Sequence, residues 1–314
     1  QQYGDFRIVS RVLAEMHISH DFESAVPLRY AHRRDGQTEI YFVANPEDRV
    51  VSTACSFRVN GKQPELWDPL TGKVRNLPQF TMKDASTSVN LRFEPYQSYF
   101  IVFRTSGEKQ KPMPRNFVDA ETWSELTGPW EVRFDPQWGG PEKTTFERLE
   151  DWTQRPEEGI KYYSGTAIYS KTFDLPKPKG DVNETQNPVQ RSWLDLGSVK
   201  NLARVQLNGK EIGTLWCAPW RVDITELVKP NGNKLEIAAV NLWPNRLIGD
   251  EQLPPDAEFG KNGNLLRMPD WVVKNEQRPS TGRYAFSTWK HFTKDSALLP
   301  SGLLGPVQIL RSVE

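Results

Sequence analysis

The segment Ala203–Ile212 constrains the fold of this chain most strongly, because apolar and polar residues alternate up to an Asn208–Gly209 pair and a second short strand follows. Period-two alternation is typical of a strand with one buried face. Asn-Gly readily adopts the positive φ angles that a tight type I′ hairpin turn needs. The segment therefore predicts a β-hairpin in an antiparallel sheet.

Further strand candidates occur at close spacing along the chain, separated by turn signals rather than long helical patterns. This organisation indicates antiparallel β-sandwiches, and a length of 314 residues favours two domains. One helical pattern covers Phe6–His17 and could be the remnant of a preceding domain. The strand candidates are Glu39–Ala44, Ala54–Val59, Val89–Phe93, Tyr99–Phe103, Trp130–Phe134, Thr166–Phe173, Ser192–Leu196, Ala203–Leu207, Leu235–Leu242 and Val307–Leu310.

We predict an all-β chain in which an N-terminal antiparallel β-sandwich over residues 1–105 is followed by a linker over 106–116 and a second β-sandwich over 117–314. The linker is indicated by the stretch Thr105–Pro114, which is polar, charged and contains proline. The first residues, roughly 25 of them, could be a remnant of a preceding domain, since they contain the helical pattern Phe6–His17 in an otherwise strand-rich region.

Charge and cysteine content exclude several classes of protein. The chain has 40 Lys and Arg residues against 40 Asp and Glu residues, so no overall field attracts nucleic acid or an anionic membrane. No apolar run approaches the ~20 residues of a membrane-spanning helix. The two cysteines, Cys55 and Cys217, are too few for a disulfide scaffold or a thiolate zinc cluster. We expect neither nucleic acid nor a membrane as a partner.

Sequence patterns that carry catalysis are missing. The chain has no Walker pattern, no G-x-G-x-x-G after a strand and no G-x-S-x-G elbow, so we predict no catalytic residue, no metal site and no cofactor. The loop after Ile248 does carry four carboxylates, at Asp250, Glu251, Asp256 and Glu258. Two of them could act as the acid and base of a glycosidase, several could bind a structural calcium ion, or all could be solvated side chains.

Tryptophan is abundant, with 11 residues in the chain. Core packing is the alternative for each of them, since indoles suit sandwich interiors. Trp216 and Trp243 stand where strands give way to loops, which makes them candidates for stacking on sugar rings, and Asn245 and Arg246 add hydrogen-bonding groups beside Trp243. We predict a carbohydrate-binding set made of Trp243, Asn245, Arg246, Trp216, Trp271 and Asp250.

The second domain resembles the sugar-binding, galactose-binding-like jelly-roll domain of family 2 glycoside hydrolases. Within the shared motifs, Gly165 permits a tight turn into the following strand, and Asn208–Gly209 forms the hairpin. Thr225 can cap the short turn Glu226–Val228. The resemblance implies a jelly-roll β-sandwich over residues 117–314. It rests on Leu126–Trp130, Tyr163–Tyr169, Leu194–Gly197, Val205–Lys210, Pro219–Thr225 and Gly302–Val307.

A longer pattern resembles the region after the catalytic barrel in family 106 α-L-rhamnosidases. It rests on Tyr30–Gly36, Ile40–Asn45, Glu65–Gly72 and Asn241–Asp250. In that family the acid and base carboxylates lie on a preceding (β/α) barrel, and this chain shows no series of alternating strands and helices. The resemblance implies a C-terminal accessory region of a bacterial, polysaccharide-degrading glycoside hydrolase, with no catalytic residue carried over.

The same resemblance implies the surroundings in which such a region works. The location would be periplasmic or secreted, and the first partner would be the missing N-terminal catalytic domain. The ligand would be a plant or host glycan, which could contain rhamnose.

Three other hypotheses stay open. The chain could be a self-sufficient lectin-like module, which would bind glycan without a barrel. It could be a purely structural buttress, which would bind no glycan and expose a large apolar patch. It could also be a small hydrolase that uses carboxylates of the Asp250–Glu258 loop.

Overall fold

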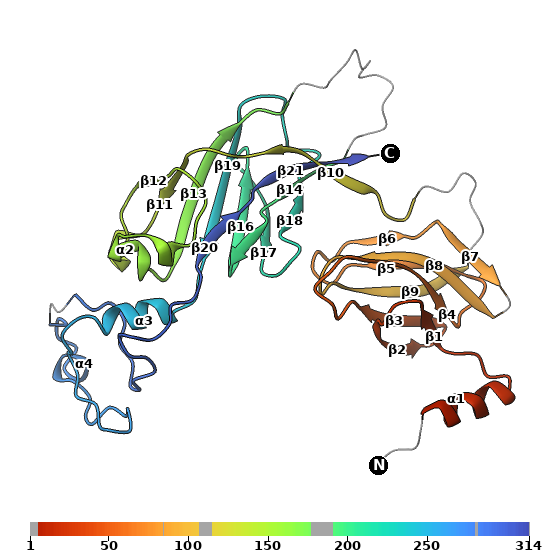
Figure 1. Ribbon diagram of the computed structural model, residues 1–314, viewed down its shortest axis with the longest axis horizontal. Helices are drawn as coiled ribbons and strands as arrows, with labels where there is room; N and C mark the ends of the chain where they lie inside the picture. Colours follow the sequence, from red (N-terminus) through yellow and green to blue (C-terminus); the bar gives the residue numbers. More distant parts are fainter. Residues whose placement is uncertain (1–5, 84, 107–114, 177–190, 280–281, 314) are drawn as a thin grey trace. The chain divides into compact units, whose positions relative to one another are not determined.

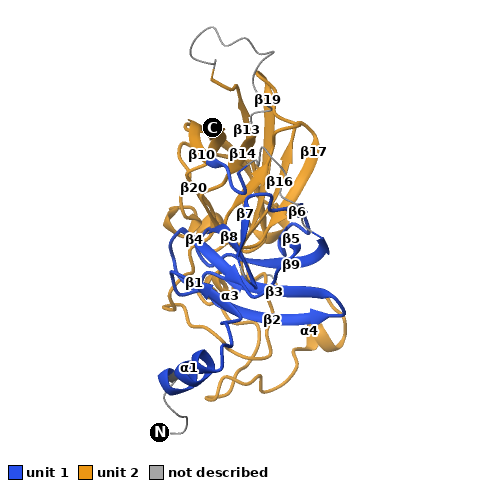
Figure 2. Ribbon diagram, turned by 90° about the vertical axis from the view of Figure 1, so that its right-hand side faces the viewer, with its two compact units in different colours: residues 1–119, 314 blue, residues 120–313 orange. Residues whose placement is uncertain are grey.

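The computed structural model describes residues 6–83, 85–106, 115–176, 191–279 and 282–313 (Figure 1). They form two compact units, unit 1 up to residue 119 and unit 2 over residues 120–313 (Figure 2). Both units are built from antiparallel sheets, which confirms the predicted all-β fold. The predicted linker over residues 106–116 lies mostly outside the described residues.

Unit 1 is a β-sandwich in which a four-stranded and a five-stranded sheet share one core. Tyr41 and Phe57, one from each sheet, are fully buried with their rings edge to face at 5.0 Å. Helix α1 (Phe6–Glu15) precedes the sandwich, in the region where the sequence predicted a helix. The smaller sheet has the order β1 (Phe22–Ser24), β4 (Val51–Phe57), β8 (Ser86–Phe93), β7 (Phe80–Lys83), and the larger β2 (Arg29–Asp35), β3 (Thr38–Ala44), β9 (Ser98–Ser106), β5 (Lys62–Trp67), β6 (Val74–Asn76).

Unit 2 packs a six-stranded sheet against a four-stranded sheet over a second core, with a short two-stranded sheet beside them. The six-stranded sheet has the order β12 (Thr144–Phe146), β11 (Trp130–Arg133), β13 (Thr166–Phe173), β19 (Asn233–Val240), β16 (Leu202–Leu207), β17 (Lys210–Leu215). The others have the orders β10 (Asp119–Glu125), β21 (Gln308–Val313), β14 (Ser192–Asp195), β18 (Arg221–Asp223), and β15 (Ser198–Lys200), β20 (Gly302–Gly305).

Strands β16 and β17 form the hairpin that the sequence predicts. Asn208 and Gly209 have φ angles of 52° and 83°, and Leu207 pairs with Lys210 across the turn. Alternate residues of β16, including Val205 and Leu207, are buried in the core of unit 2. The period-two pattern and the turn residues therefore specify the same local structure.

The helices of unit 2 are short. They are η1 (Pro136–Trp138), η2 (Trp152–Gln154), α2 (Glu158–Lys161), α3 (Pro244–Asp250) and α4 (Asp270–Val273). After α3, a segment over residues 251–301 leads to β20, and its described parts, 251–279 and 282–301, have little regular structure. Across the described ranges, helices and strands do not alternate as a (β/α) barrel requires. Within the same ranges, none of the helices combines the length and the apolar composition needed to cross a membrane.

Candidate functional site

The segments that follow β11 and β19 lie at the same end of the six-stranded sheet of unit 2. Strand β13 lies between these two strands and runs antiparallel to both. Arg133 at the end of β11 pairs with Ile168, and Val240 at the end of β19 pairs with Thr166. Both strands therefore end beside the start of β13, and the loops that follow them are neighbours at the lower end of the sheet in Figure 1.

Each of these two loops presents a tryptophan. The ring centroids of Trp138 and Trp243 lie 6.0 Å apart with an interplanar angle of 87°, which is an edge-to-face pair. Their exposed fractions are 40% and 54%, so neither indole belongs to the core. The pair offers flat apolar surface to solvent.

Local contacts fix the loop that carries Trp138. The short helix η1 begins after Asp135, whose Oδ1 accepts a hydrogen bond from Gln137 N at 2.9 Å. It ends at Gly139, where φ is 82°. A Cβ atom at Gly139 would lie 2.7 Å from the tip of the Tyr284 side chain, so a larger residue there would displace Tyr284 as well as strain the backbone. Tyr284, from the 251–301 segment, thus packs closely on the turn.

Buried polar groups hold the backbone that leads into Trp243. The Asn241 Oδ1 accepts a hydrogen bond from Gly165 N at 2.9 Å, which joins the end of β19 to the start of β13. The Ser164 Oγ donates to Leu242 O at 2.8 Å. Because these groups are buried and paired, the position from which the Trp243 ring projects is fixed by the fold.

Asn245, which the sequence predicted to bind carbohydrate, is a structural residue. Its side chain is 1% exposed. Its Nδ2 donates to Leu299 O at 2.7 Å and to Ser301 Oγ at 3.0 Å, and its Oδ1 accepts from Leu299 N at 2.8 Å. Asn245 therefore ties the end of the 251–301 segment to α3, with its side chain buried away from the surface.

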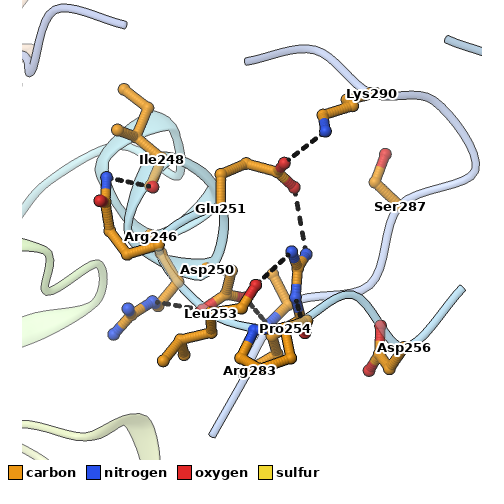
Figure 3. Close-up of polar contacts among 12 residues, drawn as sticks. Arg246, Ile248, Asp250, Glu251, Leu253, Pro254, Asp256, Arg283, Ser287 and Lys290 are labelled. Carbon is orange, nitrogen blue, oxygen red and sulfur yellow. Dashed lines mark hydrogen bonds and ion pairs between the residues drawn. The ribbon is translucent and has the colours of Figure 1, made fainter. Parts of the chain in front are cut away.

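Arg246 and Asp250, also in the predicted set, form a buried ion pair instead. Their exposed fractions are 5% and 2%, and Arg246 Nε lies 3.1 Å from Asp250 Oδ1 without the alignment of a hydrogen bond (Figure 3). The guanidinium lies over the Tyr284 ring at 4.9 Å. Asp250 Oδ2 accepts hydrogen bonds from Tyr284 N and Ala285 N at 3.1 and 2.7 Å. Both charges therefore hold the 251–301 segment against α3.

The next carboxylates of the loop face cations rather than one another. Glu251 lies 3.1 Å from Arg283 and 2.8 Å from Lys290 (Figure 3). Asp256 lies 2.6 Å from Arg278. Burial opposes ionisation of Glu251, but hydrogen bonds from Lys290 and Arg283 outweigh burial and lower the pKa of its carboxyl. A general acid needs a raised pKa, so these contacts speak against a catalytic carboxylate pair here. Among the described residues, no three His, Cys, Asp or Glu side chains are grouped to hold a metal ion.

The folded loop encloses one small pocket. Its volume is about 40 Å³, and Glu251, Arg283, Trp289 and Lys290 are among the residues that line it. Ligand pockets usually measure roughly 300–1,000 Å³, so a sugar ring does not fit inside. Trp138 and Trp243 lie outside this pocket, on the exposed surface of unit 2.

Trp216 and Trp271, the remaining members of the predicted set, differ from each other. Trp216 follows the last residue of β17 and is 62% exposed. Trp271 in α4 is partly buried, with its ring edge to face against Phe286 at 5.3 Å and Arg278 over it at 5.1 Å. The exposed members of the predicted set are thus Trp216 and Trp243.

Sequence reasoning missed Trp138 and Tyr284. A signal for Trp138 exists, because a proline before it and the Gly139–Gly140 pair after it mark a loop that directly follows a strand. Tyr284 carries no local signal. Its packing on Gly139 depends on how the 251–301 segment folds back towards the sheet.

Two family models match parts of the chain. Residues 5–82 match the alpha-L-rhamnosidase family of glycoside hydrolases, and residues 150–273 match the galactose-binding domain-like family of glycosyl hydrolase 2. The two matches fall in unit 1 and unit 2 respectively, and they confirm both resemblances that the sequence motifs indicate.

Two longer proteins are similar to most of the chain. A Formosa agariphila protein with the provisional name beta-glucuronidase is 40% identical over 278 residues, which are 86% of this chain and 22% of that protein. The structure of a rhamnosidase from Novosphingobium sp. PP1Y is 32% identical with a TM-score of 0.78, over 96% of this chain and 26% of that chain. The chain therefore spans about a quarter of the length of these relatives and is related to glycoside hydrolases through both units.

Proposed function

We propose that this chain is a non-catalytic accessory region of a glycoside hydrolase and that unit 2 binds carbohydrate on the Trp138–Trp243 pair. The observation that carries the proposal is an exposed edge-to-face indole pair at the fixed end of a galactose-binding-like sandwich. An indole face can pack on the apolar C–H face of a sugar ring, since aromatic side chains contribute large apolar area in a defined orientation. The exposed Gln137 beside Trp138 can bind hydroxyls at the ring edge.

The non-catalytic part of the proposal is supported by the carboxylates of the 251–301 segment. Glu251 and Asp256 are engaged by Arg283, Lys290 and Arg278, which leaves them ill-suited to act as an acid and base pair. Hydrolysis would then belong to a catalytic barrel outside this chain, which spans 26% of the rhamnosidase structure.

Helix α1 supports packing on such a barrel. Its apolar side chains recur on one helical face, and their exposed fractions lie between 37% and 55%, while Met16 directly after the helix is 61% exposed. Exposed apolar stripes of this kind usually mark a contact surface. We propose that the stripe packs on the catalytic domain, that the protein is periplasmic or secreted, and that the glycan is of plant or host origin and contains rhamnose. The stripe consists of Ile8, Val9, Val12, Leu13 and Met16.

Isothermal titration calorimetry on the isolated chain tests carbohydrate binding. We expect rhamnose-containing oligosaccharides to bind with a Kd on the order of 1 mM or tighter. A Kd of that size corresponds to a binding free energy of about −4 kcal/mol. Trp138→Ala and Trp243→Ala should each weaken binding at least about fivefold. Trp289→Ala is the matched control, because Trp289 is 45% exposed but lies outside the pair.

The outcomes separate the proposal from its alternatives. Binding that both substitutions abolish supports a sugar site on this surface. Absence of binding across rhamnose- and galactose-containing glycans would contradict the site and favour a structural buttress. Binding that survives both substitutions would place the sugar elsewhere in the chain.

A further inference from the structure

Trp216 lies at the same end of the six-stranded sheet as the Trp138–Trp243 pair. Strand β16 lies between β19 and β17 and runs antiparallel to both. Its first residue, Leu202, pairs with Val240, the last residue of β19, and the neighbouring Ala203 pairs with Leu215, the last residue of β17. The residue that follows Leu215 is Trp216, which the register therefore places level with the end of β19, with β16 between the two strands.

The order of strands sets the order of the three exposed indoles. Trp138 follows β11, Trp243 follows β19 and Trp216 follows β17, with β13 and β16 filling the two gaps. Neighbouring strands are about 4.8 Å apart, so the ends of β19 and β17, two spacings apart across β16, lie roughly 10 Å from each other. Trp216 therefore follows a strand end that is two strands away from the one that leads to Trp243.

An exposed polar residue lies at the start of each of the two strands, β13 and β16, that separate the strands leading to the indoles. Thr166 starts β13, between the strands that lead to Trp138 and Trp243. Asn201 directly precedes β16, and its backbone N–H donates to Val240 O at 2.7 Å. The Asn201 side chain is exposed and makes no hydrogen bond to the described residues. Aromatic and polar groups thus alternate along this end of the sheet.

We propose that the row Trp138, Trp243 and Trp216, with Asn201 between the last two, binds an extended glycan chain of several sugar residues rather than a single sugar. This inference rests on the proposed carbohydrate binding at Trp138 and Trp243 and adds Trp216 as a second subsite. The Trp138–Trp243 pair packs on one sugar ring and Trp216 on another, and the Asn201 carboxamide, which can both donate and accept, binds hydroxyls between them.

A ligand-length series tests the row. The isolated chain is titrated calorimetrically with rhamnose and with rhamnose-containing oligosaccharides from the disaccharide to the hexasaccharide. We expect affinity to rise at least about tenfold across the series. Trp216→Ala should remove that rise and leave the affinity for the shortest ligand that binds unchanged, and Asn201→Ala should reduce the rise. Trp289→Ala, which removes another exposed indole, should change neither.

The outcomes distinguish the row from the pair. If the affinity is independent of length, or if Trp216→Ala leaves the rise intact while Trp243→Ala abolishes binding, the pair stands and the row is wrong. If no ligand binds, both the pair and the row are wrong. Trp216 and Asn201 are exposed, so unchanged thermal unfolding of their variants will show that any loss reflects the site and not the fold.

Discussion

Asn245 shows how a residue chosen from sequence as a ligand contact can serve the scaffold. Its amide satisfies both backbone groups of Leu299, the residue that begins the return of the 251–301 segment to the sandwich. Sequence places a polar residue after a strand end beside Trp243, and that pattern does not reveal whether the side chain points outwards or inwards. Asn245 has a structural role because its side chain is buried, and it is buried because residues more than fifty positions away in the sequence fold over it.

The amide of Asn245 should therefore matter for stability. Replacement by Ala removes the hydrogen bonds that the buried Asn245 amide makes to both backbone groups of Leu299 and to the buried Ser301 hydroxyl, which we expect to lower the free energy of unfolding by about 1–3 kcal/mol. Urea unfolding followed by fluorescence measures this. Asn201→Ala is the matched control, since it removes an exposed amide that makes no hydrogen bond to the residues that the structure describes. Equal stability of both variants would show that Asn245 does not anchor the segment.

Glu251 makes the anchoring of the same segment dependent on pH. Burial disfavours its charge, yet the hydrogen bonds from Lys290 and Arg283 lower its pKa on balance. A carboxyl whose pKa is lowered by folding adds stability above its unfolded pKa, about 4.3, and that stability disappears as the pH falls through the folded pKa. Glu251→Gln should thus unfold at lower urea than the natural protein at pH 7, and the difference should shrink below pH 4.3.

The control for this pH effect is Glu258→Gln. The Glu258 side chain is 70% exposed and lies 4.0 Å from Arg267, so its replacement should leave the unfolding midpoint almost unchanged. A Glu251→Gln difference that persists undiminished at acid pH would show that packing, not charge, is responsible.

At the scale of elements, the hairpin β16–β17 could be predicted because its information is local. Alternation, Asn208 and Gly209 lie within ten residues, and the turn they form is the one observed. The order β11–β13–β19–β16–β17 could not be predicted, because it joins strands that are far apart in the sequence. Since that order brings Trp138 next to Trp243, one half of the candidate site followed from sequence and the other half required the fold.

A substitution in the β16–β17 turn tests whether its own residues determine the turn conformation. Gly209 has a φ of 83°, and a Cβ there would meet no atom within 4 Å. A larger residue at this position would therefore be unfavourable only because of its positive φ angle, not because of a clash. Gly209→Ala should therefore lower the free energy of unfolding by about 1–2 kcal/mol. Lys210→Ala, at the next position, should have a much smaller effect. A neutral Gly209→Ala would mean that the turn relaxes without cost.

At the scale of the whole molecule, sequence motifs indicated both units and their relation to glycoside hydrolases, and the family matches and the rhamnosidase structure confirm this. Motifs identify families well because they sample residues throughout the fold. They identify surfaces poorly, since a surface is a product of long-range packing. The chain spans about a quarter of its longer relatives, and α1 carries an apolar stripe that unit 1 does not cover.

If that stripe is a contact surface and not part of a core, charges on it should not harm the isolated chain. Val9 and Val12 are 53% and 45% exposed. We expect the Val9→Glu, Val12→Glu double variant to keep its unfolding midpoint within about 0.5 kcal/mol and to bind less of an apolar fluorescent dye. A large loss of stability would assign the stripe to the core of unit 1.

The central claim is that a glycan lies on the Trp138–Trp243 pair, and indole N–H resonances report on it most directly. The chain has 11 tryptophans, whose indole signals can be assigned by substitution and followed in ¹⁵N-correlated NMR spectra. On titration with a rhamnose-containing oligosaccharide, we predict that the Trp138 and Trp243 signals shift together, while those of the buried Trp130 and Trp152 stay in place. Shifts confined to other tryptophans, or no shift at saturating glycan, would contradict the account.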